Sequence, residues 1–179
     1  MAAIASWEDL ALELVAQQLV CGNCVRLTLT TTSMAPFLLP GDRLLLATVA
    51  VESLVVGDLV AIAARPCPLV HRMVAAPGRR GGQRVVTKGD AGTTFDRQFP
   101  PEAILGRVVS VQRNDKVLPL AAHNAYCGAR ILAWLSWCCA GAANVAVPSL
   151  RRAIFFLLRR LMYVVSGAVW SIAQRPSGC

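Results

Sequence analysis

Hydrophobic and polar residues follow three successive patterns along the chain. Between Ser6 and Val20 the apolar residues recur at helical spacing, and the acidic residues lie mostly on the other side. This spacing predicts an amphipathic helix, with Ser6 and Asp9 placed as in a capping box. We expect the helix to cover one edge of a core, with membrane or partner contact as the alternative. Its apolar residues are Trp7, Leu10, Ala11, Leu14, Val15 and Leu19.

A period of two replaces the helical spacing between Val25 and Arg113. Alternating apolar and polar residues, many of them β-branched, predict six strands: Val25–Thr31, Arg43–Val51, Leu59–Ala64, Leu69–Ala75, Gln83–Thr87 and Ile104–Arg113. Turn residues separate them at Pro40–Asp42, Val56–Asp58, Pro77–Gly78 and Gly81–Gly82. The pattern therefore predicts an antiparallel or mixed β domain.

The last part of the chain is apolar and carries arginines. Residues 131–147 contain no charge and end at Pro148, so they are at the lower limit for crossing a bilayer. From Ser149 to Ala173 two arginine pairs fall on one helical arc, as in a basic amphipathic helix that lies in a membrane interface. Whether the first segment spans or lies flat stays open. We therefore divide the chain into an N-terminal helix and linker (1–24), a β-rich core (25–120) and a basic apolar helical tail (121–179).

Composition narrows the possible partners. Of the 179 residues, 55% are hydrophobic and only 16% charged, which excludes a disordered chain, a coiled coil and a nucleic-acid-binding tail. The net charge is +8, but the six arginines after Ala129 stand among apolar residues without any acid. Such embedded cations favour a membrane surface over nucleic acid as the partner.

The cysteines and the start of the chain bear on the compartment. Seven cysteines cannot all pair within the chain, and Cys21 and Cys24 form an isolated C-x-x-C without metal-spaced histidines. We expect no metal and no cofactor, and a reducing compartment. The first 25 residues contain three acids and no basic residue, unlike a signal peptide, so we expect a cytosolic start.

Few residues could serve as a catalytic base. The chain has two histidines, His71 and His123, and two lysines, Lys88 and Lys116. A serine hydrolase would have to draw its base from these four. Ser33 follows a predicted strand where Pro36 forces a bend, so its hydroxyl would be exposed and its backbone N–H could face an incoming carbonyl.

The segment around Ser33 resembles a family signature. The string Ser33–Asp42 (SMAPFLLPGD) is similar to the S-M-x-P-x-L-x-P-G-D motif of type I signal peptidases and their LexA-like self-cleaving relatives. Four later segments resemble further family motifs in the same order: Val56–Val60, Leu69–Val74, Val86–Asp90 and Ile104–Val108. The resemblance covers about half of the chain and implies an α+β fold with a mainly-β signal-peptidase/LexA-like catalytic core.

The resemblance also implies roles for individual residues. Ser33 would be the nucleophile, His71 the general base in place of the lysine of the Ser-Lys enzymes, and Asp96 the group that orients the imidazole. The chain departs from the family at Phe95 and at Ala91–Gly92, so Asp90 stays an alternative orienting residue, although we expect it to shape the turn. The substrate-binding residues would be Leu29, Thr31, Met34 and Pro36. We expect His123 to be a structural or surface residue, and Asp42 and Asp58 to be turn residues.

The implied function is a serine endopeptidase of the signal peptidase type that cleaves a leader or signal segment from a precursor peptide. The ordinary enzymes carry an N-terminal membrane anchor, whereas here the apolar segments follow the core. We therefore expect a membrane-associated enzyme on the cytoplasmic face. The alternatives are a LexA-like self-cleaving regulator, for which one N-terminal helix is too little for a helix-turn-helix, and a non-catalytic membrane-associated scaffold.

Overall fold

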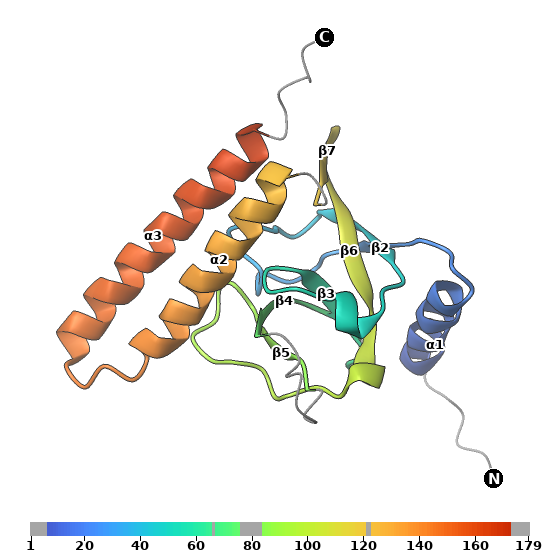
Figure 1. Cartoon of the computed structure of the whole chain (residues 1–179), viewed down its shortest axis with the longest axis horizontal. Helices are drawn as coiled ribbons and strands as arrows, with labels where there is room; N and C mark the ends of the chain where they lie inside the picture. The colour runs from blue at the N-terminus through green and yellow to red at the C-terminus, as the bar shows by residue number, and fades with distance from the viewer. Residues whose placement is uncertain (1–6, 66, 76–83, 121–122, 173–179) are drawn as a thin grey trace.

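The computed structural model describes residues 7–65, 67–75, 84–120 and 123–172, with the backbone alone at 123–126 and 172. Within these ranges the chain forms the helices α1 (Trp7–Val20), α2 (His123–Ala142) and α3 (Pro148–Ile172). Its strands are β1 (Val25–Thr28), β2 (Arg43–Ala47), β3 (Leu59–Ile62), β4 (Leu69–Ala75), β5 (Val86–Lys88), β6 (Ile104–Arg113) and β7 (Lys116–Pro119). The predicted α+β class, with an N-terminal and a C-terminal apolar helix, is confirmed (Figure 1).

The strands form one antiparallel sheet of seven strands. Six of them follow the order β1-β2-β6-β3-β4-β5, and β7 pairs with the C-terminal end of β6. The predicted strands Leu69–Ala75 and Ile104–Arg113 match β4 and β6. The other predicted strands end too late or begin too early, and β7 was not expected. The predicted turns Pro77–Gly78 and Gly81–Gly82, and residue 83, lie outside the described residues.

Both faces of the sheet are covered, because alternate residues of the central strand β3 enter different clusters. Leu59 and Ala61 join a large cluster with Met34, Phe37 and Leu38 of the loop after β1 and with residues of α2 and α3. Val60 and Ile62 join a smaller cluster with Met73, Val85 and Phe99 on the other face. This alternation follows from the period-two geometry of a strand.

Helices α2 and α3 form an antiparallel hairpin that packs beside the sheet (Figure 1). Leu132, Leu135 and Cys139 of α2, and Met162, Val169 and Trp170 of α3, are buried in the large cluster. The segment 131–147 is thus helical only to Ala142, and one side of it faces the β domain. Among the described helices, α3 is long and apolar enough over Pro148–Ser171 to cross a membrane.

Helix α1 covers part of the core only with its C-terminal half, through Val15 and Leu19. Leu19 is buried, and its carbonyl accepts a hydrogen bond from the Thr48 hydroxyl. Trp7, Leu10 and Leu14, which the sequence placed on the core-facing side, are 79%, 55% and 53% exposed. The expected apolar contact was therefore wrong for the first two turns, because the sheet edge reaches only the C-terminal end of the helix.

Candidate active site

The nucleophile candidate lies on the loop between β1 and β2. Ser33 is half-buried, and its carbonyl oxygen accepts a hydrogen bond of 2.9 Å from Ala91 N. Its hydroxyl oxygen lies 3.2 Å from the Thr31 hydroxyl oxygen. The loop is thus bound to the segment after β5, where the Val86–Asp90 motif ends.

Two glycine–aspartate turns hold the strands around this loop. Asp42 Oδ2 accepts a hydrogen bond from Leu39 N at 2.8 Å, and Asp58 Oδ2 accepts one from Val55 N at 2.9 Å. The preceding Gly41 and Gly57 adopt positive φ values of 92° and 108°, which glycine tolerates without steric cost. Both aspartates therefore stabilise turns, and Asp42 also pairs with Arg113 at 2.7 Å.

His71 and Asp96 form the closest polar pair of the candidate site. His71 is on β4, opposite Val60 of β3, and its Nδ1 lies 2.6 Å from Asp96 Oδ2. The same carboxylate oxygen accepts a hydrogen bond of 2.7 Å from the Thr87 hydroxyl, and Asp96 N donates to Thr87 O. Two side-chain contacts to the carboxylate and one backbone hydrogen bond thus fix Asp96 against β5 and the imidazole.

The pKa of Asp96 reflects these contacts. Burial raises it, but the hydrogen bonds from His71 and Thr87, together with the nearby charge of Lys88, outweigh burial and leave the pKa below its usual value. The carboxylate is therefore ionised at neutral pH. An ionised carboxylate at Nδ1 favours the imidazole tautomer that carries its proton on that nitrogen.

The other imidazole nitrogen faces the nucleophile loop. His71 Nε2 is buried and has no hydrogen-bond partner among the described residues. A Cβ atom built on Gly89 would lie 2.9 Å from this nitrogen and 2.8 Å from the carbonyl oxygen of Ser33. One point beside Gly89 is therefore close both to the imidazole and to the backbone of Ser33. The Ser33 hydroxyl itself makes no hydrogen bond to Nε2 in this arrangement.

Asp90, the alternative orienting residue, has a different partner. Its carboxylate accepts hydrogen bonds from Arg72 Nε at 2.9 Å and from Arg72 Nη2 at 2.7 Å, and both side chains are fully buried. Arg72 also donates to Gly57 O and stacks over the Phe37 ring. The pair therefore links β4 to the turn after β5 and leaves Asp96 next to His71. Sequence reasoning did not find this pair, since its members come from separate motifs.

Lys88 is also buried next to the site. Its Nζ donates to Gly89 O at 3.0 Å and to the Ser136 hydroxyl of α2 at 2.9 Å. Burial lowers the pKa of Lys88 from its usual value, and the charge of Asp90 partly opposes that shift. The hydrogen bond to Ser136 connects the helical hairpin to the strand that carries Thr87.

The four expected substrate-binding residues lie in different environments. Thr31 is exposed, whereas Leu29, Met34 and Pro36 are buried. Leu29 and Met34 belong to the large hydrophobic cluster. Their side chains therefore stabilise the loop that carries Ser33 and do not line an open groove. The side chain of His123 lies outside the described residues.

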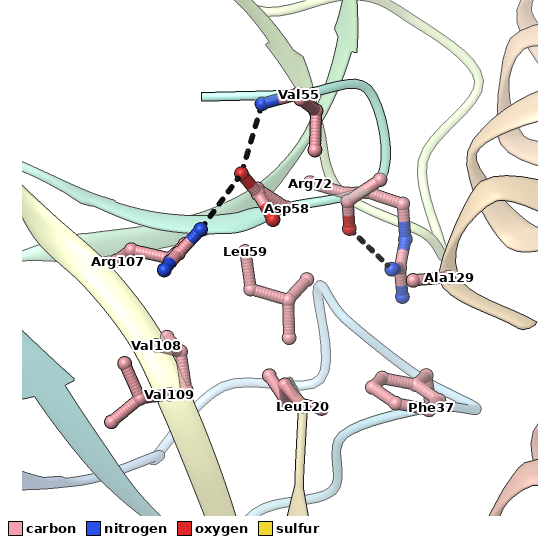
Figure 2. A pocket seen from close by; sticks show the side chains of 11 residues that line it. Phe37, Val55, Asp58, Leu59, Arg72, Arg107, Val108, Val109, Leu120 and Ala129 are labelled. Atoms are coloured by element: carbon pink, nitrogen blue, oxygen red, sulfur yellow. Dashed lines mark hydrogen bonds and ion pairs between the residues drawn. The ribbon is translucent and has the colours of Figure 1, made fainter. Parts of the chain in front are cut away.

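A small cavity lies apart from these residues, between β3, β4, β6 and α2 (Figure 2). It has a volume of about 80 Å³, and Arg72, Asp58 and Arg107 are among its lining residues. This volume is well below the roughly 300–1,000 Å³ of ordinary ligand pockets, and neither Ser33, His71 nor Asp96 lines the cavity. Among the described residues, no cluster of histidine, cysteine, aspartate or glutamate could hold a metal ion.

Comparison of the chain with protein-family models, with curated proteins and with solved structures gives no match. The function of the chain is therefore inferred from the geometry of the site and from the motifs in the sequence.

Proposed function

We propose that this protein is a serine endopeptidase that cleaves a leader or signal segment from a precursor peptide. Ser33 would be the nucleophile, His71 the general base and Asp96 the residue that orients His71. The observation that carries the proposal is the state of the His71 ring. Its Nδ1 binds an ionised carboxylate, while its buried, unpartnered Nε2 faces the loop of Ser33.

The chemistry follows from this polarity of the ring. Asp96 keeps the proton on Nδ1, so Nε2 has a free electron pair and can accept the proton of the Ser33 hydroxyl as its oxygen attacks a peptide carbonyl. The imidazolium then returns that proton to the leaving amine, and a water molecule hydrolyses the acyl-enzyme by the same steps. For the first transfer the Ser33 hydroxyl has to turn from Thr31 toward Nε2. Catalytic hydrogen bonds often tighten only when the substrate is bound.

The substrate class comes from the resemblance to type I signal peptidases. Such enzymes bind an extended peptide beside the strands at the nucleophile and accept small residues before the cleaved bond. In this chain Thr31 is exposed next to Ser33, so its segment is the proposed contact for an extended peptide. We further propose that the enzyme works at the cytoplasmic face of a membrane, without a metal, a cofactor or nucleic acid.

One observation favours a second candidate. Because the Ser33 hydroxyl contacts Thr31 and not His71, a non-catalytic scaffold that keeps the same fold would show the same contacts. A LexA-like self-cleaving regulator receives no comparable support, since the described chain before Ser33 contains one helix.

Mass spectrometry of peptide cleavage separates these candidates. The full chain is incubated with synthetic precursor peptides in which an apolar stretch precedes an Ala-Xaa-Ala sequence. We expect cleavage after this sequence by the wild type and none by Ser33→Ala or His71→Ala. Ser53→Ala, which changes an exposed serine of a remote turn, is the matched control and should cleave like the wild type. Equal cleavage by Ser33→Ala would contradict the proposal.

A further inference from the structure

The α2–α3 hairpin exposes large apolar side chains on the surface that does not contact the sheet. Trp134 and Trp137 of α2 are 61% and 54% exposed, and Phe156 of α3 is 78% exposed. Leu157, Tyr163 and Val164 of α3 are also exposed. Helical spacing brings Trp134 and Trp137 to one face of α2, and Phe156 and Tyr163 to one face of α3. We call this surface the hairpin face.

The charges around the hairpin face have one sign. Arg151, Arg152 and Arg160 are exposed on α3, and Arg160 stands one turn after Phe156. The sequence contains no acidic residue after Asp115. A hollow on α3 is lined by three aromatic rings and by two arginines from the middle of the helix. Its lining residues are Phe155, Phe156, Arg159, Arg160 and Tyr163. Arginine, tryptophan and tyrosine beside aliphatic side chains are the composition of a membrane interface, where cations meet lipid phosphates and rings enter the acyl boundary.

The packing of α3 indicates that the helix lies along the membrane and does not cross it. The helix is long enough to span, but Met162, Ser166 and Val169 on its other side are buried against the protein. Trp170 Nε1 donates to Phe37 O at 3.2 Å, and its ring lies under the Arg113 guanidinium. A spanning helix would lose these contacts and would place Arg159 and Arg160 near the bilayer centre, where charged side chains are costly.

We propose that the hairpin face docks in the plane of a bilayer that contains anionic lipid. The apolar rings supply the insertion energy, and the arginines supply attraction to the negative surface. This proposal deepens the membrane location proposed above, but it does not depend on the proposed peptidase chemistry, because none of the docking residues belongs to the candidate active site. It assigns the membrane contact to one face of a helix pair that is otherwise part of the protein core.

Vesicle binding of the full chain tests the proposal. The probes are phosphatidylcholine vesicles with and without about one third phosphatidylglycerol, which supplies the negative surface potential. Phe156→Glu and Trp137→Glu remove insertion, and the triple change of Arg151, Arg152 and Arg160 to glutamate reverses the charge. Trp7→Glu is the matched control, since Trp7 is 79% exposed but stands beside Glu8 and Asp9 on α1, at the opposite end of the molecule from the hairpin in the view of Figure 1. Circular dichroism checks that every variant folds.

We expect the wild type to sediment with the anionic vesicles, less with the neutral ones, and to be released by salt or by alkaline carbonate. Each hairpin variant should weaken this binding roughly tenfold or more, and Trp7→Glu should not change it. Retention after carbonate treatment would overturn the interfacial arrangement in favour of a spanning helix. If the folded hairpin variants bind vesicles like the wild type, the membrane is not the partner of the hairpin face. The same conclusion follows if the variants change only the self-association of the protein.

Discussion

His71 Nδ1 lies 2.6 Å from Asp96 Oδ2, although 25 positions separate the two residues in the chain. Replacement of this carboxylate by an amide should disturb the tautomer of His71 more than the fold. We expect Asp96→Asn to lower kcat by about two to four orders of magnitude and to change KM little. Steady-state kinetics with a precursor peptide that the wild type cleaves measures this effect.

Asp115→Asn is the control for this change, because Asp115 is exposed in the turn between β6 and β7. It should keep the activity of the wild type. Wild-type kinetics in Asp96→Asn would show that His71 needs no orienting carboxylate.

The ionised Asp96 also makes stability depend on pH. Its pKa is lower in the folded protein than the usual 3.8, so the unfolded chain binds more protons in acid. The contribution of Asp96 to the free energy of unfolding is therefore complete above the unfolded pKa and is lost as the pH falls through the lower folded pKa. Urea unfolding at a series of acidic pH values should show a shallower decrease of stability for Asp96→Asn than for the wild type. An equal decrease of the free energy of unfolding with pH in both proteins would mean that His71 and Thr87 do not stabilise the ionised carboxylate.

At Gly89, the addition of one methyl group should lower the activity while the protein still folds. An added Cβ would meet Ser33 O at 2.8 Å and His71 Nε2 at 2.9 Å, so the loop or the imidazole must move. We expect Gly89→Ala to lower kcat/KM by about a hundredfold, as displacements near 1 Å do in catalytic sites. Gly92→Ala in the same segment is the matched control, since its nearest atom would lie at an ordinary contact distance of 3.5 Å. Full activity of Gly89→Ala would be incompatible with a role for this contact.

The helical hairpin should contribute to the stability of the candidate site through Ser136. Its hydroxyl is one of two acceptors that the buried Lys88 ammonium has. Loss of a buried hydrogen-bond partner of a charged group costs about 1–3 kcal/mol, and we expect that range for Ser136→Ala. Ser166→Ala on α3 is the control, because this serine is also buried but its hydroxyl has no partner among the described residues. It should be neutral or stabilising in denaturant unfolding, and equal losses in the two variants would exclude a specific role for the Lys88 contact.

The sequence predicted the sheet best where strands are long. β4 and β6, with seven and ten residues, agree with the prediction at both ends. β7 was missed since it has four residues and follows a tight turn in which Asn114 has a positive φ of 53°. A strand of four residues is too short for the alternation of apolar and polar residues to reveal it, and β7 forms because it pairs with β6.

The helices show the limit of composition as a guide. Apolar residues of α2 and α3 divide between the core and the hairpin face. The arginine pairs indicated an outer arc of α3, but the composition of α2 did not show which of its apolar residues face the core. The same holds for the pairs Arg72–Asp90 and Lys88–Ser136, whose partners are 18 and 48 positions apart. The motifs did predict that Ser33, His71 and Asp96 would act together, and the kinetic experiments above test those roles.

Trapping of the acyl-enzyme tests the central claim most directly. A precursor peptide that the protein cleaves is mixed with the full chain, the reaction is stopped with acid, and the protein is digested and mapped by mass spectrometry. We expect the N-terminal fragment of the substrate as an ester on the peptide that contains Ser33, and no such adduct in His71→Ala. An adduct on a different residue, or undiminished cleavage by Ser33→Ala, would contradict it.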